Sequence, residues 1–122
     1  RKFQPNHFSG KVYVLINGGS FSASCLLASS LKSNPKVTFV GEETGGGFNT
    51  TVAGLLPVLT LPNSKLPLRI GLMDVRTTNQ TEVVGHGIYP DKEIIPTLAD
   101  RLENKDPEMD WILKDCNSKN TQ

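Results

Sequence analysis

The sequence predicts an α/β fold built around a strand–helix–strand unit near its N-terminus. Residues 12–16 form a continuous apolar and largely β-branched run, which is typical of a strand buried on both faces of a parallel sheet. From Ser22 to Leu31 the apolar residues instead share a stripe with the period of a helix. A second short β-branched run follows at 37–40, so residues 11–40 are predicted to form a βαβ unit.

Turn residues mark the boundaries of these elements. Asn17-Gly18-Gly19 ends the first strand, and Asn34-Pro35 ends the helix. After a glycine-rich loop at 41–47, residues 50–61 and 66–74 are predicted to be the strands of a β-hairpin, with a turn at 62–64.

The C-terminal third is expected to add a strand and helices to the same single domain, 1–122. Residues 75–86 are polar and predict a mobile loop, 87–91 a turn, and Ile94-Ile95 a short strand. Helices are predicted at 98–102 and 107–113, the second with Asp106 as its N-cap and Pro107 at its first position. Residues 117–122 are expected to be a frayed tail.

Composition excludes several classes of function. The net charge is +1 and the Lys and Arg residues are scattered, so no nucleic-acid partner is expected. The longest mostly apolar run, 52–61, is too short to cross a membrane and contains Pro57. The glycine-rich loop lacks the following Lys-Ser/Thr of a P-loop, and we expect no cofactor and no metal. Cys25 and Cys116 are expected to be free, and Cys25 to be a small buried residue.

The chain starts at Arg1, with no initiator Met and no signal peptide. We therefore expect it to be a processed or excised part of a longer polypeptide, and part of its functional site to lie outside it.

The turn between the first strand and the helix suits a nucleophilic serine. Such a serine needs a sharp turn that exposes its hydroxyl, and backbone N–H groups nearby that hold a developing oxyanion. A helix that begins there supplies unpaired N–H groups and a favourable dipole. The candidate nucleophile lies within Ser20–Ser24, and for Ser22 the following Ala23 would offer its N–H beside a side chain too small to obstruct a substrate.

A simpler interpretation stands beside this one. Ser20, Ser22 and Ser24 would serve as helix caps after a turn, where serine is favoured. The nucleophile elbow of the α/β-hydrolases is not indicated, because it needs a glycine two residues after the serine.

Four segments, taken in order, resemble the catalytic core of the C-terminal processing peptidases, or tail-specific proteases. Their cousins are the tricorn core protease and the interphotoreceptor retinoid-binding protein. The segments are Lys11–Ser24 (KVYVLINGGSFSAS), Val40–Gly46 (VGEETGG), Leu61–Ser64 (LPNS) and Gly85–Asp91 (GHGIYPD).

The resemblance implies a Clp protease/crotonase-like fold of repeated ββα units, of which this chain would be the C-terminal part. It implies that Ser22, the middle serine of the Ser-x-Ser-x-Ser run, is the nucleophile, and that Ala23 gives one oxyanion-hole N–H. A glycine-rich turn upstream of this chain would give the second N–H. Gly41-Glu42 and Thr44 would shape the loop beside the nucleophile.

The departures from the family's pattern concern the general base. The tail-specific branch has a lysine twenty-five positions after the nucleophile, where this chain has Gly47, and an acid eleven positions after it, where this chain has Ser33. The loop instead resembles the tricorn-like and retinoid-binding branch, whose active peptidases use an upstream histidine with a serine and a glutamate. Glu82 is the nearest candidate for that glutamate, although Val84 holds the aligned position.

The chain has two histidines of its own that would accept a proton near neutral pH. His86 lies between two glycines and is expected to be a flexible surface residue, and His7 lies in the leading segment. Glu42 and Glu43 are expected to be structural or exposed. Asp91 is expected to cap backbone N–H groups in a turn.

Two functions and one assembly remain open at this point. The leading hypothesis is a serine endopeptidase that acts on protein or peptide substrates through an acyl-enzyme on Ser22, with its base in the upstream part of the same polypeptide. The alternative is a non-catalytic module that binds an apolar ligand or a peptide. Exposed edges would also allow a homodimer or strand exchange. The resemblance further implies export to the periplasm or cell envelope of a bacterium.

Overall fold

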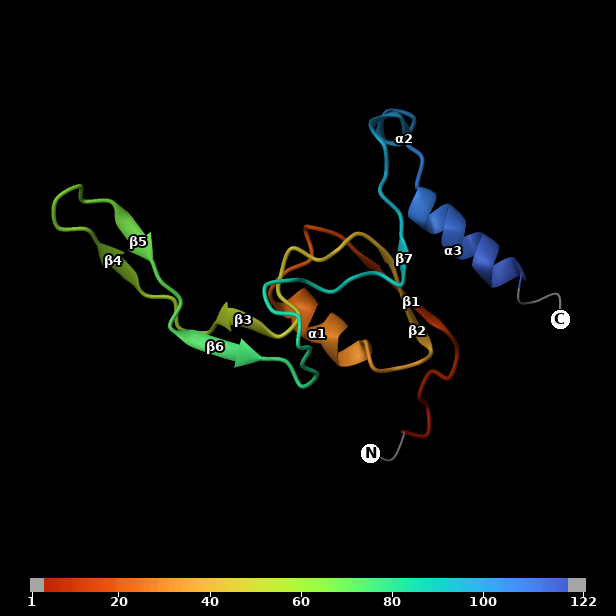
Figure 1. Ribbon diagram of the computed structural model, residues 1–122, viewed down its shortest axis with the longest axis horizontal. Helices are drawn as coiled ribbons and strands as arrows, with labels where there is room; N and C mark the ends of the chain where they lie inside the picture. The colour runs from red at the N-terminus through yellow and green to blue at the C-terminus, as the bar shows by residue number, and fades with distance from the viewer. Residues whose placement is uncertain (1–3, 119–122) are drawn as a thin grey trace.

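The computed structural model describes residues 4–118 and confirms a mixed α/β fold (Figure 1). Its central sheet holds β1 (Val12–Ile16), β2 (Val37–Gly41) and β7 (Lys92–Glu93) in the order β1-β2-β7. β1 and β2 are parallel over their whole length, and α1 (Ala23–Leu31) connects them. The βαβ unit predicted for residues 11–40 is therefore confirmed.

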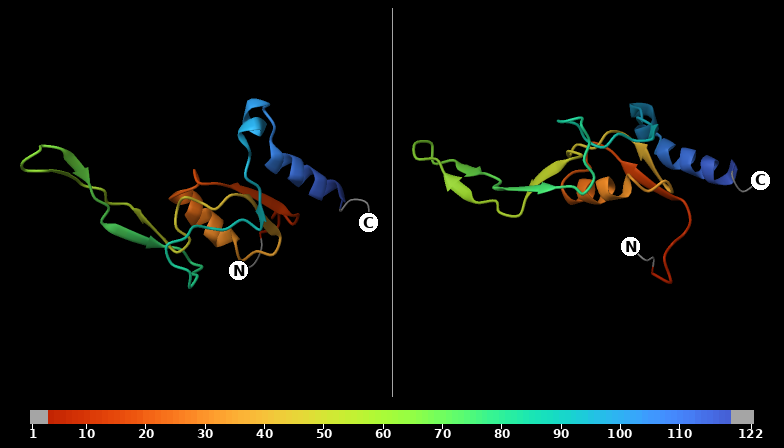
Figure 2. Two further views of the ribbon diagram at one scale, coloured as in Figure 1. Left: turned by 45° about the horizontal axis from the view of Figure 1, so that its top comes forward. Right: turned by 60° about the horizontal axis from the view of Figure 1, so that its bottom comes forward.

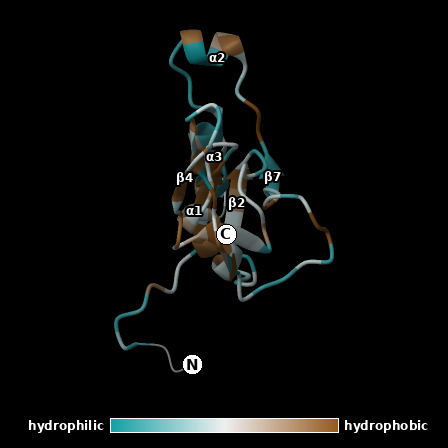
Figure 3. Cartoon of the chain, turned by 90° about the vertical axis from the view of Figure 1, so that its left-hand side faces the viewer, coloured by the Kyte–Doolittle hydropathy of each residue, from teal (hydrophilic) through white to brown (hydrophobic). Residues whose placement is uncertain are grey.

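The core lies on the face of the sheet that α1 covers. Ile16, Ala28, Phe39 and Ile88 form its buried cluster. Partly buried side chains surround this cluster: Val14, Leu31, Val37 and Phe48. Figure 3 colours the chain by hydropathy; α1 includes hydrophobic segments, and most of the leading segment is hydrophilic to intermediate.

The prediction that the first strand is buried on both faces is wrong. Leu15 is 48% exposed, because successive side chains of a strand point to opposite faces and α1 covers only one of them. On the other face α3 (Pro107–Ser118) contacts Tyr13, whose ring centroid lies 6.4 Å from that of Trp111. Asp115 of α3 accepts hydrogen bonds from the Tyr13 hydroxyl and, at 2.7 Å, from Lys11. Burial and the bond to Asp115 raise the pKa of Tyr13.

The C-terminal helices begin where they were predicted. α2 (Leu98–Leu102) has a capping box between Thr97 and Asp100. Asp106 caps the start of α3 by accepting from the Met109 N–H at 2.9 Å. α3 is longer than predicted and includes Asn117 and Ser118, and the rest of the predicted tail lies outside the described residues.

The predicted strand at Ile94-Ile95 is wrong by two residues. β7 is Lys92–Glu93, which pairs with Val40 and Gly41 of β2. The Ile94 N–H still donates to Gly41, but β2 ends there, so Ile95 has no strand partner.

The predicted hairpin is confirmed, but each of its strands is broken in two. β3 (Thr50–Ala53) pairs with β6 (Met73–Arg76), and β4 (Val58–Thr60) pairs with β5 (Pro67–Arg69). Together they form an arm that projects from the sheet and its helices (Figures 1 and 2). Within residues 4–118, no helix is long and apolar enough to cross a membrane.

Candidate active site

The site is built on the tight turn that leads from β1 into α1. Asn17 closes this turn: its carbonyl accepts from the Ser20 N–H at 2.8 Å and its side chain from the Gly19 N–H at 2.9 Å. The Ser20 hydroxyl in turn accepts from the Asn17 N–H at 3.2 Å. Ser20 is therefore engaged in holding the turn, and the chain reaches the helix within three further residues.

Ser22 adopts a backbone conformation that is rare for a residue with a side chain. Its φ is 55° and its ψ is −121°, and such geometry costs about 1–3 kcal/mol. Ser22 occupies the N-cap position of α1, yet its hydroxyl makes no capping hydrogen bond. A serine that only capped the helix would have extended backbone and a bonded hydroxyl. The capping interpretation therefore does not account for Ser22.

The N–H of Ala23 is placed as an oxyanion donor would be. The first turn of α1 satisfies the Ser22 carbonyl, which accepts from Cys25 at 3.0 Å and from Leu26 at 3.1 Å. Among the described residues the Ala23 N–H has no hydrogen-bond acceptor. It lies beside the half-buried Ser22 at the positive end of the helix dipole.

The glycine-rich loop packs directly against this turn. The Gly46 N–H donates to the Ser20 carbonyl at 3.0 Å, and the Cys25 thiol donates to the same carbonyl at 3.2 Å. A Cβ on Gly45 would lie 2.2 Å from the Gly18 carbonyl oxygen, and one on Gly46 would lie 2.8 Å from Phe21 Cα. Glycine is required at both positions because backbone approaches backbone there.

Thr44 holds the glycine-rich loop in this position through hydrogen bonds. Its buried hydroxyl donates to the Gly46 carbonyl at 2.8 Å and accepts from the Ile88 N–H at 2.7 Å, while its own N–H donates to Ile88. A Cβ on Gly87 would lie 2.1 Å from the Thr44 carbonyl oxygen. The segments Val40–Gly46 and Gly85–Asp91, with 38 residues between them in the chain, therefore interlock beside the nucleophile turn.

Glu43 and His86, one from each of these two segments, contact each other. Glu43 accepts from the Gly87 N–H at 2.7 Å and lies 3.3 Å from Nδ1 of His86, which is 2.5 Å from the Tyr89 hydroxyl. Glu43 therefore has the structural role predicted for it. Neither His86 nor any other residue of the described range hydrogen-bonds the Ser22 hydroxyl.

The other acid and base candidates lie in loops. Glu82 is exposed in the loop that follows β6 and makes no hydrogen bond within residues 4–118. Its supporting role stays a prediction. His7 lies in the leading segment, where its Nδ1 is 2.8 Å from the Gln4 carbonyl.

Asp91 accepts a hydrogen bond from a backbone N–H and also forms an ion pair with Lys32 at the end of α1. One carboxylate oxygen accepts from the Phe39 N–H at 2.8 Å and the other from Lys32 at 2.7 Å. Partial burial opposes ionisation, but the hydrogen bonds from Lys32 and Phe39 outweigh it and lower the pKa of Asp91. The predicted capping role is confirmed.

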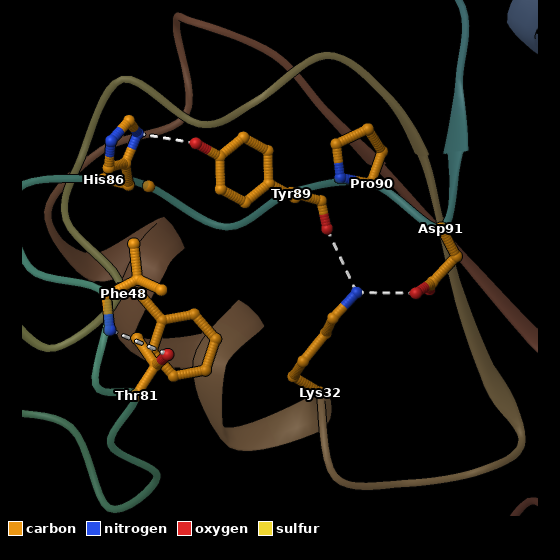
Figure 4. Close-up of a pocket in the computed structure, with 9 residues that line it drawn as sticks. Lys32, Phe48, Thr81, His86, Tyr89, Pro90 and Asp91 are labelled. Carbon is orange, nitrogen blue, oxygen red and sulfur yellow. Dashed lines mark hydrogen bonds and ion pairs between the residues drawn. The ribbon is translucent and has the colours of Figure 1, made fainter.

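A cavity of about 350 Å³ lies beside this ion pair (Figure 4). Its apolar wall includes Phe48, Val83, Tyr89 and Pro90, and Lys32 and His86 lie at its border. In Figure 4 the Lys32 ammonium lies between Asp91 and the Tyr89 carbonyl, at 3.0 Å from the latter. Lys32 is ten residues beyond Ser22, about 15 Å along a helix, and neither Ser22 nor Ala23 lines this cavity.

The structural roles of two residues, Cys25 beside the nucleophile turn and Lys32 beside the cavity, were not predicted. Cys25 was predicted to be a buried hydrophobic residue, and it is buried, but its thiol also helps to hold the Ser20 carbonyl. Lys32 carried no sequence signal beyond its place at the end of the helix. In the range 4–118 no group of three or more His, Cys, Asp or Glu side chains is arranged to hold a metal ion.

Comparisons with known proteins found a matching family and a similar structure. The family model "Peptidase family S41" matches residues 1–94, which include the turn, the glycine-rich loop and the interlocking segment. A crystal structure from Parabacteroides merdae, described as a "putative peptidase", is similar with a TM-score of 0.64 and 27% identity. The match covers 88% of this chain but only 32% of that one, so the chain spans about a third of that relative's length. Curated proteins gave no match. The chain belongs to peptidase family S41.

Proposed function

We propose that this chain carries the nucleophile of a serine peptidase, and that Ser22 is that nucleophile. The observation that carries the proposal is the conformation of Ser22: a strained backbone at a strand-to-helix turn, with a hydroxyl that caps nothing. Strain of this kind persists only where the surrounding structure enforces it. Here the Asn17 turn and the Gly45-Gly46 contact enforce it.

The reaction we infer is acyl transfer through a covalent intermediate. The Ser22 oxygen attacks the carbonyl carbon of a peptide bond, and the Ala23 N–H stabilises the oxyanion that forms. The C–N bond then breaks, the amine leaves with a proton, and an ester to Ser22 remains. Water hydrolyses this ester and regenerates the serine.

The general base is proposed to come from a part of the polypeptide outside this chain. His86 is engaged with Glu43 and Tyr89, and Gly47 offers no side chain at the position of the family's lysine. An upstream histidine is the remaining proposal, with Glu82 as its candidate support. The repeated ββα units of a Clp protease/crotonase-like fold, export to the periplasm and tail-specific cleavage likewise stay predictions from resemblance.

Casein cleavage by the full-length protein tests the proposal. We expect Ser22→Ala to abolish cleavage, because the attacking oxygen is lost. Ser24→Ala is the matched control, since Ser24 is an exposed serine two residues away, at the start of α1, and should retain activity. Equal activity of wild type and Ser22→Ala would contradict the proposal.

A binding module on the same scaffold is the second candidate. The cavity beside Lys32 favours it, because apolar side chains line most of it and its volume of about 350 Å³ suits a small ligand. This candidate predicts that neither the wild type nor Ser22→Ala cleaves casein. It also predicts that the two proteins bind anilinonaphthalene sulfonate with the same affinity. Loss of probe binding in Val83→Asp would locate that binding in the cavity.

A further inference from the structure

Ser20, the first serine of the Ser-x-Ser-x-Ser run, uses each of its polar groups in a hydrogen bond within the protein. Its N–H donates to the Asn17 carbonyl at 2.8 Å, and its hydroxyl accepts from the Asn17 N–H at 3.2 Å. Its carbonyl accepts from the Gly46 N–H at 3.0 Å and from the Cys25 thiol at 3.2 Å. Ser20 is therefore fixed both to the end of β1 and to the glycine-rich loop.

The backbone of Ser22 is held from two sides. On its C-terminal side the first turn of α1 holds it, because the Cys25 and Leu26 N–H groups donate to the Ser22 carbonyl. On its N-terminal side only Phe21 separates it from Ser20. The Phe21 side chain is 64% exposed, so its ring anchors the chain little. The N-terminal hold on Ser22 therefore comes mainly from Ser20.

This hold keeps Ser22 in a conformation that it would not adopt as an ordinary helix cap. A capping serine has extended backbone, and its hydroxyl accepts from the N–H two or three residues further on, which here is that of Ser24 or Cys25. Ser22 instead has a φ of 55°, and its hydroxyl caps nothing. If the hold were loosened, the strain would favour a return of Ser22 to the cap conformation. Its hydroxyl would then be engaged with the helix.

We propose that Ser20 is a positioning residue, which keeps Ser22 out of the helix-cap conformation and so keeps the Ser22 oxygen available for attack. The proposal rests on the proposed role of Ser22 as the nucleophile. The Ser20 hydroxyl bonds Asn17 and not Ser22, so its effect is transmitted through the backbone. Ser20 takes no part in proton transfer.

Two substitutions at position 20 separate the hydroxyl from the rest of the side chain. Ser20→Ala removes the hydroxyl, whereas Ser20→Thr keeps it. Ser20 lines a cavity of about 270 Å³ between β1 and α1, which gives the added methyl group of threonine room.

Kinetics of the full-length protein measure the effect of the hydroxyl. Ser20→Ala should lower kcat on casein, and the rate of fluorophosphonate labelling at Ser22, about fivefold to tenfold, as expected for the loss of one hydrogen bond. It should change KM less than about twofold, because Ser20 acts on the position of the nucleophile and not on substrate binding. Ser20→Thr should recover at least about half of the wild-type rate, and Ser24→Ala, the control, should keep all of it.

A stability measurement tests the same proposal without activity. In the wild type, Ser22→Ala removes no capping bond and should leave the unfolding equilibrium of the 122-residue chain nearly unchanged. In the Ser20→Ala background Ser22 becomes a cap. Adding Ser22→Ala there should raise the unfolding equilibrium constant about fivefold, the usual effect of losing a serine cap. Urea unfolding of the four proteins, followed by fluorescence of the single tryptophan, Trp111, gives this coupling.

The outcomes separate this proposal from the proposed function. Wild-type kcat and labelling in Ser20→Ala, a change in KM alone, or the same effect of Ser22→Ala in both backgrounds would each overturn the positioning role. Equal losses in Ser20→Thr and Ser20→Ala would overturn the role of the hydroxyl. In all these cases the proposed function stands as long as Ser22→Ala abolishes labelling. A wild type labelled no more than Ser22→Ala would overturn the proposed function, and this proposal with it.

Discussion

Gly46 offers a direct test of how the nucleophile turn is held. In Gly46→Ala the new Cβ would lie 2.7 Å from the Cys25 sulfur and 2.8 Å from Phe21 Cα, where ordinary contacts begin at 3.4 Å. Relief requires the loop to retreat by roughly 0.7 Å, because the Phe21 backbone itself is fixed by the first turn of α1. That retreat lengthens the Gly46 to Ser20 hydrogen bond from 3.0 Å to about 3.7 Å, which breaks it.

The expected loss of stability combines two terms. Overpacking costs about 1–3 kcal/mol and the hydrogen bond about 1 kcal/mol, so we expect roughly 2–4 kcal/mol in all. Urea unfolding followed by Trp111 fluorescence should show a midpoint lower by more than about 1 M. Gly18→Ala is the control, since a Cβ there meets nothing within 4 Å, and it should shift the midpoint little. Equal midpoints for the two variants would refute the close approach of loop and turn.

Three further substitutions test neighbouring parts of the site. Ser22→Gly should stabilise the fold by about 1 kcal/mol, because glycine adopts a positive φ without strain. Ser22→Ala should give no such stabilisation. Urea unfolding measures the stability of both variants. Thr44→Val should destabilise by about 2–4 kcal/mol, since it leaves the Gly46 carbonyl and the Ile88 N–H without their partner; thermal unfolding measures it. Asp91→Asn should destabilise the fold at neutral pH. Because the folded-state pKa of Asp91 is lowered below 3.8, its contribution is present above that value and is lost as the pH falls through the folded-state pKa. Urea midpoints of the wild type and of Asp91→Asn should therefore approach each other as the pH falls below about 3.8, and a gap that does not narrow between about pH 7 and about pH 2 would contradict this.

Hydrophobic pattern and breaker residues predicted the βαβ unit, the hairpin and the starts of the helices. These elements depend on local signals: the run at 12–16, the helical stripe after Ser22, and Asp106-Pro107 at the start of α3. The errors came from partners that a local pattern does not contain. The exposure of Leu15 depends on which faces the helices cover, and the position of β7 depends on where β2 ends.

The sequence offered candidate residues for the site but not their conformation. The Ser-x-Ser-x-Ser run offered three serines, and the resemblance to the peptidase family selected Ser22 among them, yet a serine after a glycine turn is also compatible with a helix cap. Only the φ of 55° and the unbonded hydroxyl distinguish the two roles. Likewise, the need for glycine at position 46 follows from its contact with Phe21, a residue twenty-five positions earlier in the chain.

Labelling with a fluorophosphonate probe tests the central claim most directly, because the probe reports the nucleophilicity of one serine. The full-length protein is treated with the probe, digested, and mapped by mass spectrometry. The account predicts one adduct on Ser22, absent from Ser22→Ala and unchanged in Ser24→Ala. An adduct on Ser20 or Ser24, or a wild type that is labelled no more than Ser22→Ala, would contradict it.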